Sequence, residues 1–220
     1  DVVGGNASLE RELAALIAVA SAVAAAHRLD EVIEIAAEEA LGAIGAASLS
    51  IERWIPDRGI LRTLVNVGDL APGEERHPTD EMYQLEGDRD LRRVLEDGGT
   101  YFCSLDDPEI ADVEAELLRG LGKHSSVAVP ITFGGETWGQ IWAARRADQQ
   151  PFSERDARFL HAISGQVGSA IAHACASDAP VLITGPTGIG KSLTAQVIHL
   201  HSARQQGPFV TLSCASLPES

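Results

Sequence analysis

The segment whose residue types and spacing point most directly to chemistry is a glycine-rich run that ends in a lysine and a serine. It fits the P-loop pattern G-x-x-x-x-G-K-[ST]. It lies between an apolar stretch at 181–184 and a helix-like stretch at 193–201, which is the strand–loop–helix context that the pattern requires. Its glycines permit positive φ values, so that successive backbone N–H groups point into one phosphate-binding concavity. The predicted nucleotide-binding residues are Gly185, Pro186, Thr187, Gly188, Ile189, Gly190, Lys191 and Ser192.

The last two residues of this segment are expected to make the strongest contacts with a nucleotide. Lys191 would neutralise the β- and γ-phosphates of ATP, and the hydroxyl of Ser192 would bind Mg²⁺. The N-terminus of the following helix adds its own preference for anions. Most of the 220 residues precede this segment, however, and need another explanation.

Composition and charge limit the classes of function. The formal net charge is −15, and so acidic a chain repels phosphate backbones, which argues against direct nucleic-acid binding. No apolar run approaches the roughly 20 residues of a membrane span, and the first residues resemble no signal peptide. Cys103, Cys175 and Cys214 lie far apart without metal-ligand spacing and are typical of reduced thiols. We therefore expect a cytoplasmic protein that does not bind a membrane.

Hydrophobic periodicity predicts the elements that must position any site. A first helix after Ser8 has Leu13, Leu16, Ile17, Ala20 and Val23 on one face, and a second, with Asp30 as N-cap, places Val32, Ile35, Ala36 and Ala40 inward. Period-two alternation predicts strands over 49–55 and 60–67, with Leu49 and Ile51 alternating with Ser50 and Glu52. Further elements are expected as a long loop over 69–89, a helix over 91–96, a strand over 100–105 and a helix over 108–121. Strands over 125–133 and 137–145 are expected to form a hairpin that turns at Gly134 and Gly135, and a last helix, opened by a capping-box pattern at 152–156, to run to about 174. This order predicts an α+β fold, with helices packed on an antiparallel sheet.

The order of these elements and several of their residues resemble a GAF domain. The supporting segments are Leu29–Val32, Ser126–Ile131, Phe133–Gly139 and the exit helix that begins at Phe152–Asp156. The resemblance covers residues from about 8 to 174 and implies a regulatory domain that holds a small ligand between its sheet and the helices and loops above it. The pocket residues that it implies are Trp54, Met82, Tyr83, Tyr101, Cys103 and Trp142, with ordinary core packing as the alternative for each.

The resemblance leaves the ligand open. Cys103 lacks the neighbouring histidine that is usual for bilin attachment. His77 and His124 are candidate haem ligands, but each is an isolated histidine. Reduction of methionine sulfoxide would need several pocket cysteines, and there is one candidate. The apolar stripes of the first and last helices imply a homodimer, with packing on the domain's own sheet as the alternative.

Residues 180–220 resemble the start of the AAA+ domain of sigma-54-dependent transcription activators. The match includes the P-loop, the following helix through Val197–Ser202 and the segment Gly207–Ser220. The family usually has glutamate at Pro186, threonine at Ile189 and glutamate at Ser192. The sequence contains no Walker B strand, GAFTGA loop, arginine finger or helix–turn–helix, which speaks against ATP hydrolysis by this polypeptide.

Two domains are therefore expected: a GAF sensory domain over 1–174 and a truncated P-loop βαβ corner over 175–220 that needs docking to be ordered. Their abrupt junction suggests an internal deletion, a truncation or a fusion. The favoured function is a signal-sensing module of a transcription regulator, with ATP and Mg²⁺ as further ligands and sigma-54 RNA polymerase as a partner only in a full-length protein. The alternatives are a nucleotide-binding fragment and an empty GAF domain that only dimerises.

Overall fold

A computed structural model describes residues 2–25, 28–85, 89–176, 183, 191–200, 202 and 204–211. At its centre is a six-stranded sheet in the order β3-β2-β1-β6-β5-β4, in which every neighbouring pair is antiparallel. In chain order the strands are β1 (Ser48–Ile55), β2 (Ile60–Gly68), β3 (Met82–Gln84), β4 (Tyr101–Ser104), β5 (Ser125–Phe133) and β6 (Glu136–Arg145). The predicted α+β class with an antiparallel sheet is confirmed.

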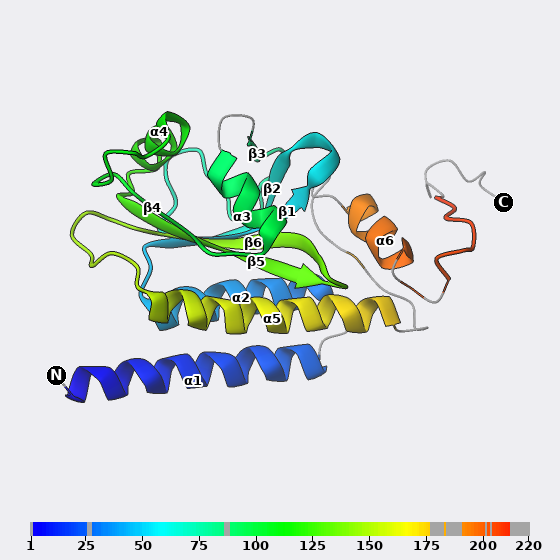
Figure 1. Cartoon of the computed structure of the whole chain (residues 1–220). Helices are drawn as coiled ribbons and strands as arrows, with labels where there is room; N and C mark the ends of the chain where they lie inside the picture. Colours follow the sequence, from blue (N-terminus) through cyan, green and yellow to red (C-terminus); the bar gives the residue numbers. More distant parts are fainter. Residues whose placement is uncertain are drawn as a thin grey trace.

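Helices cover both faces of this sheet (Figure 1). On one face lie α2 (Leu29–Ile44) and α5 (Glu154–Ala176), and α1 (Val2–Ala25) packs beneath these two as a further layer. On the other face lie α3 (Arg89–Asp97) and α4 (Asp112–Gly120). The last described helix, α6 (Lys191–Leu200), contacts α5.

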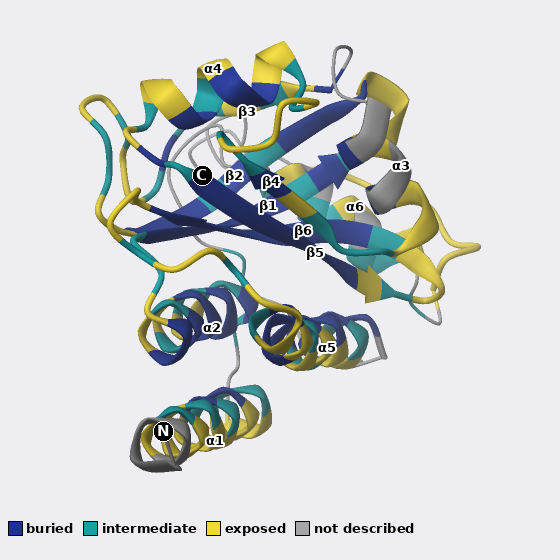
Figure 2. Ribbon diagram, turned by 60° about the vertical axis from the view of Figure 1, so that its left-hand side comes forward, coloured by how far each residue is buried: buried dark blue, intermediate teal, exposed yellow. Residues whose placement is uncertain are grey.

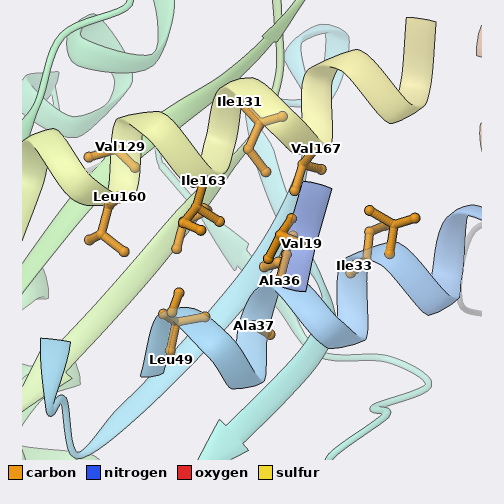
Figure 3. Close-up of a cluster of buried hydrophobic side chains, with 14 of the residues drawn as sticks. Val19, Ile33, Ala36, Ala37, Leu49, Val129, Ile131, Leu160, Ile163 and Val167 are labelled. Carbon is orange, nitrogen blue, oxygen red and sulfur yellow. The ribbon is translucent and has the colours of Figure 1, made fainter. Parts of the chain in front are cut away.

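The larger hydrophobic core lies between the sheet and the layer formed by α2 and α5. Figure 3 shows Leu160, Ile163 and Val167 of α5 beside Ala36 and Ala37 of α2. Small alanines on α2 let that helix approach closely, while branched residues on α5 fill the space between the two helices and the strands. Ile198 of α6 also packs against this core.

A smaller core lies on the opposite face, beneath α3 and α4. Along β1 the side chains alternate, so that Leu49 and Ile51 belong to the larger core while Trp54 belongs to the smaller one. The predicted alternation along β1 is therefore confirmed. Ser50 and Glu52 are buried as well, because both faces of this central strand are covered.

The helix boundaries and faces differ from the predictions in several places, of which three concern α1 and α2. Helix α1 buries Ala15 and Val19, whereas Leu13 and Ile17 are exposed, so the single predicted apolar face is in fact two stripes. The cap of α2 is Arg28 and not Asp30, which lies inside the first turn. On the same helix Ile35 is exposed, and Ile33 is buried in its place.

The predicted loop over 69–89 contains a strand. Three residues, Met82–Gln84, pair with β2 at the edge of the sheet and form β3. The run is too short and too polar to show an alternating pattern, so its conformation depends on the partner strand.

Two local predictions are confirmed in detail. The β5–β6 hairpin turns at Gly134 and Gly135, which have φ values of 62° and 85°, a region that favours glycine. At the start of α5 the Ser153 hydroxyl accepts the Asp156 N–H at 3.3 Å, and the Asp156 carboxylate accepts the Ser153 N–H at 2.8 Å. This reciprocal pair is the predicted capping box.

The predictions for the C-terminal segment are only partly covered by the structure. The expected strand at 181–184 and the loop at 185–190 lie outside the described residues, except for Ile183. Of the cysteines, Cys103 and Cys175 are buried and form no disulfide within the described part of the chain, and Cys214 lies outside the described residues. No helix in the described part of the chain has the length and apolar content needed to cross a membrane.

Candidate ligand-binding site

A cavity of about 220 Å³ lies between the sheet and the elements above it, next to the smaller core. Strands β1, β2 and β6 form its floor, and β3, α3 and α4 form its walls. Its apolar lining comes from most of these elements: Leu61, Met82, Tyr83, Leu85, Leu91, Val113, Leu117, Leu121 and Trp142. Its polar lining consists of Ser50, Glu52, Glu74, Gln84, Glu114 and Gln140.

The polar centre of the floor is a pair of side chains on adjacent strands. Glu52 on β1 lies directly opposite Gln140 on β6, and the Gln140 Nε2 donates to the Glu52 Oε2 at 2.6 Å. Glu52 is 4% exposed and Gln140 is 1% exposed. The Gln140 Oε1 has no hydrogen-bond partner within the described part of the chain. A buried acceptor without a donor is costly, and the side chain that carries this atom lines the cavity.

Burial changes the acid–base behaviour of the pair. Removal from water raises the pKa of Glu52 to about 7, although the Gln140 hydrogen bond opposes this effect. The nearby carboxylate of Glu81 raises the pKa further. Glu52 therefore changes charge near neutral pH, which is unusual for a carboxyl group.

A hydrogen-bonded network borders the cavity beside Glu52. The Ser50 hydroxyl donates to Asn66 Oδ1 at 2.6 Å, and Asn66 Nδ2 donates to both carboxylate oxygens of Glu81 at 3.1 Å. Glu81 also accepts from the hydroxyls of Thr63, at 2.7 Å, and Tyr83, at 3.2 Å. Burial, and then the charge of Glu81, raise the pKa of Tyr83, so its hydroxyl remains a donor. These bonds hold Tyr83 at the cavity wall.

Two further carboxyl groups line the cavity from outside the sheet. Glu114 on α4 is buried, and Glu74 in the segment between β2 and β3 is half-buried. Burial raises the pKa of Glu74, while the backbone N–H of Ala71, which donates to its carboxylate, lowers it. Glutamates thus surround the polar end of the cavity on several sides.

The structure divides the residues that the GAF resemblance assigned to a pocket. Met82, Tyr83 and Trp142 line the cavity. Trp54 and Cys103 are instead buried in the smaller core, and Tyr101 packs against that core. The two histidines considered for haem lie elsewhere, with His77 near Glu34 and His124 paired with Asp106.

Three polar residues of the cavity, Glu52, Glu114 and Gln140, are not identified by the sequence patterns. The alternation along β1 assigns Glu52 to a solvent-facing position, as it does for polar residues on most half-exposed strands. The signal that could have found it is the central place of β1 in the sheet, since a strand covered on both faces must direct its polar residues toward a core or a cavity.

The predicted nucleotide site is described only at its end. Gly185, Pro186, Thr187, Gly188, Ile189 and Gly190 lie outside the described residues, while Lys191 and Ser192 begin α6. The described residues contain no group of three or more side chains suited to hold a metal ion. Ser192 therefore stays a prediction as a ligand of nucleotide-bound Mg²⁺.

Two models of known protein families match the chain, one in its larger N-terminal part and one in its C-terminal part. The model of the GAF domain matches residues 28–171, more than half of the sequence. The chain belongs to the GAF domain family. The model of the sigma-54 interaction domain matches residues 161–220, so the GAF domain continues into part of a second domain. Both matches include residues 161–171, which lie in α5.

Curated relatives are bacterial transcription regulators. The chain is 54% identical over 44 residues to the regulatory protein AtoC of Escherichia coli, covering 20% of this chain and 10% of AtoC. It is 46% identical over 61 residues to the anaerobic nitric oxide reductase transcription regulator NorR of Serratia proteamaculans, covering 28% and 12%. It is 32% identical over 111 residues to the transcriptional regulatory protein FlbD of Caulobacter vibrioides, covering 49% and 23%. The chain thus spans less than a quarter of the length of each of these relatives.

Solved structures support the fold. A phycocyanobilin-bound GAF domain from a cyanobacterial phytochrome superposes with a TM-score of 0.60 at 18% identity, over 74% of this chain and 94% of that one. The GAF domain of a phosphoenolpyruvate-protein phosphotransferase from Coxiella burnetii gives a TM-score of 0.59 at 18% identity, over 75% and 95%. At such identities the likeness concerns the fold alone.

Proposed function

We propose that this GAF domain is the signal-sensing module of a transcription regulator and that it binds a small ligand in the cavity beside Glu52. The observation that carries the proposal is a mainly apolar cavity whose floor includes Gln140, a buried side chain whose Oε1 has no hydrogen-bond partner in the described structure. Ligand sites typically combine apolar walls with a few polar groups placed in this way. The transcription-regulator role rests on the partial sigma-54 interaction domain and on the curated relatives.

Transmission of ligand binding would pass through the sheet to the helices on its other face. Gln140 belongs to β6, which pairs with β5, and β5 packs against α5. Helix α5 in turn contacts both α1 and α6. A shift of the cavity floor therefore has a packed path to the helix that leads into the second domain.

We propose that two copies of the chain form a homodimer through α1, so that the signal reaches both copies through the same contact. The side chains of Leu9, Leu13 and Ile17 recur every four residues and are 58%, 57% and 58% exposed. Figure 2 shows the exposed face of α1 on the side away from α2 and α5. An apolar helical stripe of this kind is suited to pairing with the same stripe of a second copy.

Thermal-shift titration of the chain with a panel of small metabolites tests the sensing role. We expect at least one metabolite to raise the unfolding midpoint of the chain, because a compound that binds only the native state stabilises it. Val113→Trp, at an exposed position of the cavity lining, should block that shift. Glu116→Trp, on the same helix but outside the cavity lining, is the matched control and should leave the shift unchanged. Equal shifts in both variants would place the ligand outside the cavity.

ATP binding is a second candidate function, supported by the sigma-54 interaction domain match, whose family binds ATP, and by Lys191 and Ser192 at the N-terminus of α6. In a full-length regulator ATP turnover would drive the action on sigma-54 RNA polymerase under control of the sensor. Mg-ATP should raise the unfolding midpoint of the parent chain but not that of Lys191→Ala. Equal behaviour of the two proteins would remove ATP binding from the functions of this chain.

A further inference from the structure

We infer that the cavity selects a compact organic cation: an aromatic or apolar body that carries a protonated amine or an amidinium group. This inference rests on the proposed sensing function and adds the chemical class of the ligand. The features that carry it are the charges of the lining, the buried acceptors of Glu52 and Gln140, and the aromatic walls.

The lining has a one-sided charge distribution. Glu52, Glu74 and Glu114 contribute three carboxyl groups from three different parts of the fold. None of the described residues that line the cavity is lysine, arginine or histidine. An anionic ligand would have to be desolvated beside these carboxyl groups without a compensating cation, which is strongly unfavourable, whereas a cation would be compensated.

The floor of the cavity needs a hydrogen-bond donor. The Gln140 Nε2 is used by Glu52, and the Gln140 Oε1 beside it is an acceptor without a partner in the described structure. Glu52 offers further acceptor capacity when it is ionised. An ammonium or amidinium group brings several N–H donors on one centre, so it can satisfy both side chains together.

Aromatic side chains form part of the remaining lining. Trp142 on β6 and Tyr83 on β3 both line the cavity. The electron-rich faces of such rings attract cations, and the attraction is stronger when the cation is shielded from water. Leu61, Leu85 and Leu91 complete an apolar wall that suits the body of the ligand.

The volume restricts the size of the ligand. About 220 Å³ is below the roughly 300–1,000 Å³ of sites for drug-sized molecules. A single ring with one cationic substituent is therefore a suitable probe, and benzamidine has that form. Benzamide and benzoate have the same ring and nearly the same shape, but they are neutral and anionic, so the three compounds separate charge from shape.

Binding of the cation should weaken at acid pH. Besides Glu52, the titratable groups around this end of the cavity are Glu74, Glu81, Tyr83 and Glu114. The charges of Lys123 and Asp69, which form an ion pair with each other, also act on Glu74. Protonation of Glu52 removes the negative charge nearest to Gln140. With its pKa at about 7, the affinity for benzamidine should fall about tenfold from pH 8 to pH 6.

The test is to titrate the whole chain with the three probes at pH 8 and pH 6 and to measure binding by NMR or calorimetry. We expect benzamidine to bind at least tenfold more tightly than benzamide, with no binding of benzoate. Glu52→Gln should remove most of this preference and its pH dependence, while Glu38→Gln, at an exposed glutamate of α2, should change neither. Circular dichroism of each variant verifies that it is folded.

Several outcomes would overturn the inference. Tighter binding of benzamide or benzoate, or unchanged benzamidine affinity in folded Glu52→Gln, would show that the cavity does not select a cation. If benzamidine fails to bind but a neutral or anionic metabolite does, and Val113→Trp blocks it, the sensing function stands and the cationic class is wrong. If no compound of any charge binds, both the class and the sensing function are wrong.

Discussion

Gly168 of α5 lies against the carbonyl oxygen of Thr132 in β5 so closely that a Cβ atom at residue 168 would overlap that oxygen. Helix and strand therefore approach backbone to backbone at this position, because no side chain separates them. Three residues earlier on the same helix, a Cβ atom at Gly165 would meet nothing within 4 Å.

This difference predicts opposite effects of the same substitution. Gly168→Ala should lower the free energy of unfolding by about 1–3 kcal/mol, since the helix or the strand must move to admit the methyl group. Gly165→Ala should be neutral or stabilising by up to about 1 kcal/mol, because alanine favours the helix. Urea denaturation measures both, and a loss of similar size in the two variants would contradict the close contact.

The raised pKa of Glu52 predicts how stability depends on pH. The folded-state pKa is about 7 against an ordinary 4.5, so the proton is bound more tightly in the folded state. The corresponding stabilisation, about 3 kcal/mol, is fully present below pH 4.5 and is lost as the pH rises through 7. Urea denaturation of the parent chain and Glu52→Gln from pH 4.5 to pH 8 should show the parent losing stability relative to the variant.

Glu109→Gln is the control for this prediction, because Glu109 is exposed in the segment before α4. Its difference from the parent should stay constant over the same pH range. A constant difference for Glu52→Gln as well would mean that Glu52 is ionised throughout, and the argument from burial would fail.

The exposed stripe on α1 predicts the oligomeric state. If Leu9, Leu13 and Ile17 form the dimer contact, replacing all three with glutamine should convert a dimer into a monomer in sedimentation equilibrium. Phe102→Gln, at an exposed apolar residue of β4, should leave the dimer intact. A parent chain that is monomeric, or a triple variant that still dimerises, would exclude this surface.

The capping box of α5 predicts a modest local effect. Ser153→Ala removes the side-chain oxygen that accepts the Asp156 N–H and should lower the free energy of unfolding by about 1 kcal/mol. Ser169→Ala, at an exposed serine within the same helix, should change it by less than about 0.5 kcal/mol. Thermal or urea denaturation distinguishes the two, and equal losses would argue against a capping role.

Much of the fold could be predicted because it is encoded locally. The turn at Gly134 and Gly135, the capping box at Ser153 and the two-residue alternation along β1 are short patterns that the sequence displays directly. The strand at 82–84 could not be found in this way, since its three residues adopt their conformation only through pairing with β2.

The candidate site was less accessible to sequence reasoning. Tyr83 and Trp142 could be nominated as large aromatic residues in the middle of a GAF-like sequence, and they line the cavity. Trp54 and Cys103 were pocket candidates on the same grounds, but both are buried in the smaller core. The type of a side chain does not reveal whether neighbouring residues fill the space beside it. Glu52 and Gln140 are far apart in sequence, and only strand register brings them together.

Helix α5 runs without interruption through the region shared by both domain matches. Each residue added to a helix rotates the segment after it by about 100° and advances that segment by about 1.5 Å. With Gly168 anchored on Thr132, adding one residue between Gly168 and Ala176 would present the next segment on a different side of the sensor. Adding seven residues, about two full turns, would nearly restore the original direction, so chimaeras joined through this helix should work or fail periodically with its length.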